Sequence, residues 1–263
     1  MSTRTTPWPA GTPCWADLMA PDVEAAGRFY SAVLGWEVPA PDEQHGGYVV
    51  AHVGGAATAG IGPDREGARS AWTLHFATDD ADASAAAIRG LGGSLLRPVV
   101  DVDDLGRTVV ATDPSGAVFG LWQAGTFIGG QVVGDPGGLT WEDLRSTDPA
   151  AAQAFYGGLF EYAFAPVEMA GPDYATFGPP GDPAPYGGIG GLMGGPGPSR
   201  WLVYFTVSSA DDAAAAAAAA GGIVQAPAFD TPFGRMAALV DPSGAEFWVH
   251  EDTTGRPVPD RVG

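Results

Sequence analysis

The chain has 263 residues, 45% of them hydrophobic, which is enough for one large domain or two ordinary ones. Its formal net charge is −19, and an acidic surface repels phosphate backbones, so nucleic acid is excluded as a partner. The longest apolar run, residues 213–220, is far shorter than the roughly 18 residues of a membrane span. Residues 1–13 lack the apolar segment of a signal peptide, and the single cysteine, Cys14, cannot form a disulfide within the chain; both observations favour the cytoplasm.

Two segments of the sequence repeat each other. "WADLMAPDVEAAGRFYSAVLGWEV" (15–38) returns 126 residues later as "WEDLRSTDPAAAQAFYGGLFEYAF" (141–164), since 141 − 15 = 126. The later parts match too, 71–93 with 200–222 and 104–122 with 231–250. Such a repeat indicates a duplicated structural unit. The sequence predicts an N-terminal arm (1–11), a first domain (12–124), a linker (125–138), a second domain (139–252) and a C-terminal tail (253–263).

The elements expected within one copy follow from changes in periodicity. "CWADLMA" alternates as a strand does, and Asp22 is a good cap for a helix that ends at Gly35. The "FY" pair of this helix is expected to pack it on its sheet. Further on, the pattern predicts strands near 48–53, 57–61 and 72–78, a helix over 80–91, and three strands with "DPSG" (113–116) turning the last hairpin. In the second copy, Asp148 caps a helix that begins at Pro149.

Each domain therefore consists of two copies of a module made of a strand, a helix and three further strands. This organisation predicts the α+β class. "DVEAAGRFYSAVLGW" and "DPAAAQAFYGGLFEY", with "DPSGAVFGLW" and "DPSGAEFWVH", resemble motifs of the vicinal oxygen chelate superfamily. This superfamily includes glyoxalase I, extradiol dioxygenases and bleomycin-resistance proteins. The linker resembles that of a two-domain actinobacterial subgroup labelled glyoxalase-like or hydroxylase. The resemblance implies two tandem domains, each of paired βαβββ modules whose sheet curves into an open cup.

The resemblance also implies a divalent metal, held by His and Glu side chains from the first, fifth and eighth strands of a domain. Counting from the motifs places these three positions at Trp15, Thr73 and Gly120 in the first copy. In the second copy they fall at Trp141, Leu202 and Trp248. None of the six side chains is a competent metal ligand, and a shift of one residue gives Cys14, Leu74 and Leu121, which are no better. The sequence therefore predicts no metal and no other cofactor.

Other side chains on the same strand faces could form a site, because residues i and i+2 of a strand share a face. The candidate catalytic residues are Asp17, His75, Asp143 and His250, since Asp and His can move protons near neutral pH. The candidate ligand-binding residues are Trp15, Met19, Trp122, Trp141, Arg145, Tyr204 and Trp248. Aromatic rings with a few titratable groups are typical of a pocket for a small hydrophobic or aromatic molecule.

Each of these candidates also has a structural interpretation. Trp15 and Trp141 could be core rings that fill a vestigial cup, and the two aspartates could cap a loop or pair with an arginine. The histidines could be satisfied, half-buried strand residues.

Other residues of the pattern have mainly structural interpretations. Tyr48 and Tyr174 repeat at the same offset, and His52 shares a face with Tyr48 if that strand is regular; these residues suit rim or packing positions. Arg107 and Arg235 suit structural salt bridges, with anchoring of an anionic ligand as the alternative. Cys14 is expected to point away from the face of Trp15.

Three functions stay open. The leading hypothesis is a metal-independent enzyme that performs a proton-transfer, lyase, isomerase or hydroxylase-type step on an aromatic or polyketide-like metabolite. The alternative is a non-catalytic protein that binds or sequesters a drug-like ligand. The third is a metal-dependent lyase or dioxygenase with displaced ligands. Two fused domains supply an internal pseudo-dimer, so a monomer or a homodimer is expected, with neither nucleic acid nor membrane as a partner.

Overall fold

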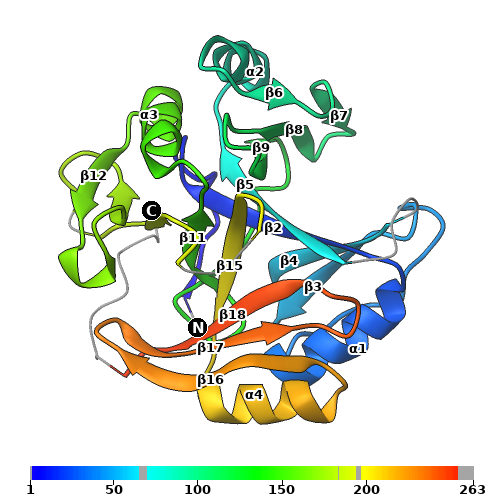
Figure 1. The fold of residues 1–263 in the computed structure, drawn as a ribbon. Helices are drawn as coiled ribbons and strands as arrows, with labels where there is room; N and C mark the ends of the chain where they lie inside the picture. Colours follow the sequence, from blue (N-terminus) through cyan, green and yellow to red (C-terminus); the bar gives the residue numbers. More distant parts are fainter. Residues whose placement is uncertain (1, 65–69, 183, 194–196, 254–263) are drawn as a thin grey trace.

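The computed structural model describes residues 2–64, 70–182, 184–193 and 197–253. They form two α+β domains, each built on one eight-stranded sheet. Figure 1 shows that both sheets are open and curved. This confirms the predicted fold class. The exact domain boundaries stay a prediction, and most of the predicted tail, residues 254–263, lies outside the described residues.

In its described residues, the first domain carries two helices on its sheet. The strand order is β3-β4-β2-β5-β9-β8-β6, with β7 also paired to β8. Where three final strands were expected there are four, because one edge strand is interrupted between β6 and β7, which both pair with β8. The elements are β2 (Pro13–Ala20), α1 (Val23–Leu34), β3 (Val49–Val53), β4 (Ala56–Pro63), β5 (Ala71–Ala77), α2 (Ala81–Gly90), β6 (Ser94–Leu95), β7 (Val100–Val102), β8 (Gly106–Thr112) and β9 (Val118–Ala124).

The second domain has the same architecture, with strand order β12-β13-β14-β11-β15-β18-β17-β16. Its edge strand β16 is continuous but shifts register twice against β17. The elements are β11 (Leu139–Arg145), α3 (Pro149–Phe160), β12 (Ala163–Pro166), the 3-10 helix η1 (Glu168–Ala170), β13 (Ala175–Gly178), β14 (Gly187–Gly190), β15 (Arg200–Thr206), α4 (Ala210–Ala219), β16 (Ile223–Thr231), β17 (Gly234–Val240) and β18 (Glu246–Glu251). Outside both sheets, β1 (Ser2–Thr3) pairs with β10 (Val132–Val133) in the linker.

The helix boundaries follow from the capping residues that the sequence shows. The Asp22 side chain accepts a hydrogen bond from the Ala25 N–H at 2.9 Å, and α1 ends at Gly35 with a φ of 70°, a left-handed conformation that glycine adopts without strain. Asp148 accepts from the Ala151 N–H at 3.0 Å, and Pro149 opens α3. Local sequence therefore fixes where the repeated helices begin.

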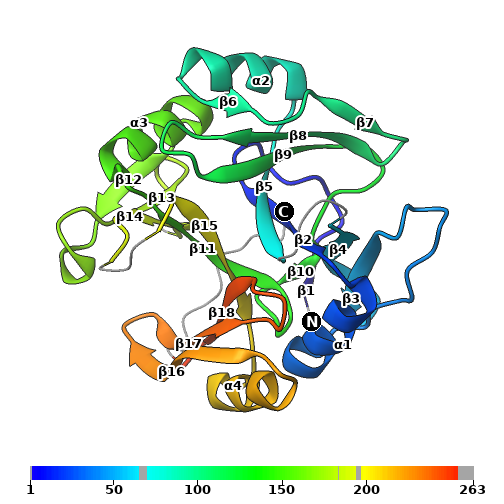
Figure 2. The same ribbon diagram turned by 45° about the vertical axis from the view of Figure 1, so that its right-hand side comes forward.

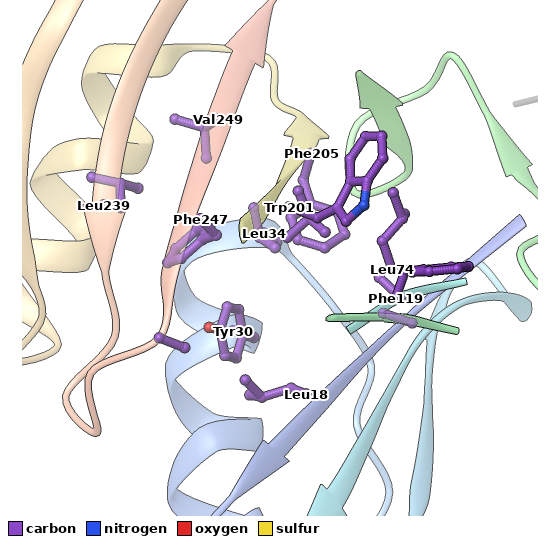
Figure 3. Packing of buried hydrophobic residues seen from close by; sticks show 14 of the residues in the cluster. Leu18, Tyr30, Leu34, Leu74, Phe119, Trp201, Phe205, Leu239, Phe247 and Val249 are labelled. Carbon is purple, nitrogen blue, oxygen red and sulfur yellow. The ribbon is translucent and has the colours of Figure 1, made fainter. Parts of the chain in front are cut away.

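The helices join the two domains rather than covering only their own sheets. Figures 1 and 2 show α1 beside α4 and α2 beside α3, and each pair takes one helix from each domain. In Figure 3, Tyr30 of α1 points toward Phe247 of β18, and their ring centroids lie 5.2 Å apart. The expectation that the "FY" pair packs a helix on its own sheet is thus incomplete, because Tyr30 also belongs to the contact between domains.

One hydrophobic cluster runs through both domains and includes Leu18, Leu74, Phe119, Phe205 and Phe247, all buried. The sheet face that carries these residues is therefore closed, and a ligand site must be sought on the opposite face. Among the described residues, no helix is both long and apolar enough to cross a membrane.

Candidate functional site

The first cup is the face of the first sheet that carries Trp15, Asp17, Met19, His75, Gly120 and Trp122. Cross-strand pairing joins Trp15 of β2 to His75 of β5, and His75 to Gly120 of β9. The second cup carries Trp141, Asp143, Arg145, Tyr204, Trp248 and His250, with Trp141, Tyr204 and Trp248 paired in the same way.

This pairing can be compared with the positions obtained by counting. His75 and Tyr204 lie opposite Trp15 and Trp141, whereas Thr73 and Leu202, the positions given by the count, pair with Asp17 and Asp143. The counted positions therefore lie on the same strand faces, two residues away from the row that crosses each sheet at the tryptophan.

Asp17 lies at the centre of the first cup. One carboxylate oxygen, Oδ2, lies 2.9 Å from His75 Nε2. The other, Oδ1, accepts a hydrogen bond from Trp15 Nε1 at 2.7 Å and one from the Tyr48 hydroxyl. Burial by itself raises the pKa of Asp17, but the charge of His75 and the hydrogen bonds from His75, Tyr48 and Trp15 together lower it below its ordinary value. Asp17 is therefore a carboxylate at neutral pH.

The ionised Asp17 determines which ring nitrogen of a neutral His75 carries the hydrogen. Because a carboxylate only accepts, the Nε2 of a neutral His75 carries the hydrogen and its Nδ1 keeps a lone pair. Nδ1 is buried and has no hydrogen-bond partner within the described part of the chain. A Cβ on Gly120 would overlap the His75 ring, so glycine at this position leaves room for the imidazole.

One end of the first cup is closed by the linker and the N-terminal arm. Phe127 lies edge-on against Trp15, with ring centroids 5.0 Å apart, and its carbonyl accepts a hydrogen bond from Trp122 Nε1 at 2.8 Å. Trp8 Nε1 donates to the Gly130 carbonyl at 2.9 Å. Trp15 and Trp122 thus pack at the closed end, whereas Met19, Thr73 and Tyr48 are half-buried around the other end.

In the second cup, Asp143 accepts four hydrogen bonds. Trp141 Nε1 (3.0 Å) and the Tyr174 hydroxyl (2.7 Å) donate to Oδ1, and Arg145 Nη2 (2.6 Å) and the Tyr204 hydroxyl (2.9 Å) donate to Oδ2. Burial by itself lowers the pKa of Arg145, but Asp143 raises it above its ordinary value, so the guanidinium stays charged. Asp143 thus matches the arginine-paired interpretation and anchors a buried network.

The structure does not bring His250 to this aspartate. His250 Nε2 lies 2.8 Å from the Phe233 carbonyl oxygen. Trp141 and Tyr204, which both donate to Asp143, also stack on Phe233 and Trp248, with centroids 5.6 and 5.3 Å apart. The two cups therefore differ: the first holds an Asp–His pair and the second an Asp–Arg pair next to stacked aromatic rings.

Three further sequence expectations can be compared with the structure. Arg107 contacts Asp82 and Asp101, and Arg235 contacts Asp211 and Asp230, at 2.7–2.8 Å, so both arginines form the expected salt bridges. The position expected for Cys14 was wrong, because a bulge between Pro13 and Trp15 interrupts the alternation and Cys14 packs in the same cluster as Trp15. A second register shift, beside His52, likewise breaks the alternation that would have placed it with Tyr48.

The residues that sequence reasoning undervalued are Tyr48 and Tyr174. Both were interpreted as rim or packing residues, yet both hydroxyls bond to the cup aspartates. A Cβ on Gly60 or Gly188 would overlap the respective tyrosine hydroxyl, so each tyrosine depends on a glycine of the neighbouring strand. The repeat offset that the two tyrosines share was the available signal.

The fold and the duplicated cups define the class of this protein. Residues 15–122 and 143–250 each match the family model of the glyoxalase-like domain, so the chain belongs to this family, in agreement with the resemblance of its motifs. It is 40% identical over 250 residues to the glyoxylase-named protein CFP32 of Mycobacterium tuberculosis, and the alignment covers 91% of this chain and 94% of CFP32. It is 34% identical over 263 residues to the anthracycline biosynthesis protein DnrV of Streptomyces peucetius, and that alignment covers 94% of this chain and 95% of DnrV.

Solved structures show the same fold. The 2,3-dioxygenase LapB from Pseudomonas sp. KL28 matches with a TM-score of 0.66 and 15% identity, over 94% of this chain and 93% of that chain. The Mn(II)-bound glyoxalase from Novosphingobium aromaticivorans matches with a TM-score of 0.65 and 16% identity, over 99% and 95%. Identities this low establish the fold and no activity.

The metal that this fold family implies does not fit the residues present here. In the first cup, the three residues paired across the sheet offer the imidazole of His75 between an indole and a glycine. In the second cup, they offer the phenol of Tyr204 between two indoles. Indole and glycine supply no side-chain donor, and divalent metals of this kind need several nitrogen or oxygen ligands. Within the described ranges, no group of three or more His, Cys, Asp or Glu side chains could hold a metal ion.

Proposed function

We propose that the first cup is the active site of a metal-independent enzyme that moves a proton on a flat aromatic or polyketide-like molecule. The observation that carries the proposal is the 2.9 Å contact between Asp17 Oδ2 and His75 Nε2, with Nδ1 of the same ring unpaired among the described residues. An oriented imidazole next to a carboxylate is a common arrangement for a general base.

The chemistry needs only the ligand and these two side chains. His75 Nδ1 takes a proton from an acidic C–H or O–H of the ligand, and the ligand keeps the electron pair as a delocalised enolate. Asp17 stabilises the imidazolium that forms. The imidazolium then returns the proton to a different atom of the same conjugated system, which yields an isomer without any further reactant. Trp15 and Tyr48 act as positioning residues, because they hold Asp17 Oδ1 and leave Oδ2 for the histidine.

The ligand class is inferred from the half-buried side chain of Met19 and ring of Tyr48 at one end of the cup, and from the relatives. DnrV is named for anthracycline biosynthesis, and anthracyclines carry flat fused rings. The net charge of −19 makes a small molecule a better partner than nucleic acid.

Deuterium exchange into 1,8-dihydroxyanthrone tests the proposal, because its central methylene group is an acidic C–H in a fused-ring system. We expect the protein to accelerate exchange over buffer, and His75→Ala to lower the accelerated rate about a hundredfold or more. His45→Ala changes an exposed histidine of a loop and should leave the rate unchanged. Exchange by His75→Ala at the wild-type rate would contradict the assignment.

The second candidate is a non-catalytic ligand-binding protein, which the stacked aromatic rings of the second cup favour. Binding of the anthrone by the wild-type protein without faster exchange would support this candidate in place of the enzyme.

A further inference from the structure

The second cup contains two buried hydrogen-bond donors that meet no acceptor in the described part of the chain. Arg145 Nη1 and Trp248 Nε1 are both shielded from solvent, and neither has a partner among the residues that the structure describes. Both groups can only donate. Leaving a buried donor unpaired costs about 1–3 kcal/mol, and more for a charged group. Two such donors in one cup indicate that an acceptor from outside the chain belongs there.

The two donors adjoin the same side chain. Trp248 stacks on the ring of Tyr204, with an interplanar angle of 24°. The hydroxyl of Tyr204 and Nη2 of Arg145 share one acceptor, Asp143 Oδ2. Arg145 therefore lies at the hydroxyl end of Tyr204 and Trp248 lies against its ring face, so both donor residues adjoin the same tyrosine.

The guanidinium N–H of Arg145 that Asp143 does not bind favours an anionic acceptor. Asp143 already accepts four hydrogen bonds, so it has no capacity left for Arg145 Nη1. Arg200 is the cross-strand partner of Arg145, and its Nε lies 3.0 Å from a carboxylate oxygen of Glu246. Two arginines thus lie side by side on the strands of a chain whose net charge is −19. A guanidinium N–H pairs best with a charged oxygen.

The wall of the cup favours flat rings. Trp141, Phe233 and Trp248 are half-buried, and Phe229, 42% exposed, lies edge-on to Trp248 with centroids 6.2 Å apart. Large, partly exposed rings grouped around buried polar atoms are typical of a site for an aromatic ligand. Because the two donor atoms are shielded, an incoming oxygen reaches them only when neighbouring rings shift.

We propose that the second cup is a separate binding site for a flat aromatic compound that carries an anionic oxygen, held by Arg145 Nη1 and Trp248 Nε1. The first cup cannot bind in this way, because Met19 occupies the position of Arg145 and Gly120 that of Trp248. Binding here does not depend on the proposed proton transfer at His75.

Isothermal titration calorimetry of the full-length protein tests the site, with 1-hydroxy-2-naphthoate as the anionic probe and its methyl ester as the neutral counterpart. We expect the acid to bind about tenfold tighter than the ester or better. Arg145→Met, which copies the residue of the first cup, should abolish this preference. Trp248→Phe keeps a ring but removes the N–H, and it should weaken binding of the acid about fivefold.

Arg145→Met leaves Asp143 buried without its cation, so the double variant Arg145→Met/Asp143→Asn serves where the single one does not fold. Arg107→Met removes an arginine elsewhere and should bind the acid as the wild type does. Equal affinity for acid and ester, a preference that survives in the Arg145 variants, or no binding of the acid at millimolar concentration overturns the proposal. The exchange assay with His75→Ala reports on the first cup alone, so either proposal can fail without the other.

Discussion

Tyr30 of helix α1 donates its hydroxyl hydrogen to Asp241 Oδ2 in the closing turn of the other domain, at 3.3 Å. Trp72 Nε1 donates to the same hydroxyl at 3.1 Å. The second domain repeats the arrangement: Trp201 Nε1 donates to the Tyr156 hydroxyl at 2.9 Å, and burial and the neighbouring Asp113 raise the pKa of Tyr156. Each domain thus contributes a tyrosine to the turn of its partner domain, which explains why "FY" and "DPSG" recur together.

Tyr30→Phe should lower the free energy of unfolding by about 1–3 kcal/mol, because Trp72 N–H and Asp241 Oδ2 both lose a buried partner. Urea unfolding followed by circular dichroism and by tryptophan fluorescence measures this change. We expect one coincident transition in both proteins, since the contact spans the domains. Ser31→Ala on the same helix is the control, with a change within about 0.5 kcal/mol. Separate transitions for the two probes in the wild type would contradict the interlocked core.

Gly60→Ala should lower the free energy of unfolding by about 1–3 kcal/mol, because the new Cβ would overlap the Tyr48 hydroxyl and Asp17 Oδ1. Gly90→Ala is the matched control: a Cβ there meets nothing within 4 Å, and alanine in a helix is favoured by up to about 1 kcal/mol. Thermal unfolding of both variants compares them directly. Equal stability of the two would mean that Tyr48 does not need the space that Gly60 leaves.

The fold could be predicted from the sequence because its signals are local and occur twice. Asp22, Asp148 and Gly35 act within one turn of the helices that they bound, and the duplication identifies the module. The cup faces followed from strand alternation. Two features escaped because they depend on pairing between strands: the bulge at Cys14, and the register that places His75 opposite Trp15.

The roles of the cup residues were harder to predict because they depend on which partner reaches each carboxylate. Asp17 and Asp143 occupy equivalent positions, yet one faces a histidine and the other an arginine. The difference arises because His75 of the first copy corresponds to Tyr204 of the second, and Met19 corresponds to Arg145. Single differences of this kind form no repeating pattern in the sequence. Tyr48 likewise gains its function from a glycine on a neighbouring strand.

The contribution of Asp17 to stability should disappear in acid. Its pKa is lower in the folded protein than the value of about 3.9 expected when unfolded, so the unfolded chain binds the proton first as pH falls. The stabilisation is complete above the unfolded pKa and is lost as pH falls through the folded pKa. Asp17→Asn should therefore be less stable than the wild type near neutral pH, and this difference should shrink below about pH 4. Urea unfolding over a pH series measures it, and a constant difference throughout would argue against the lowered pKa.

Cys14 should react slowly with thiol reagents in the native protein. Its side chain is 2% exposed, and burial, with a further contribution from Asp17, raises the pKa of the thiol above its ordinary value. Since the thiolate is the reactive form, we expect native Cys14 to react with a disulfide reagent about a thousandfold more slowly than in concentrated guanidinium. Cys14→Ser/Ala218→Cys, which moves the thiol to an exposed position on α4, is the control and should react at once. Native reaction of Cys14 as fast as that of the control would place the thiol at the surface and contradict the packing that closes the first cup.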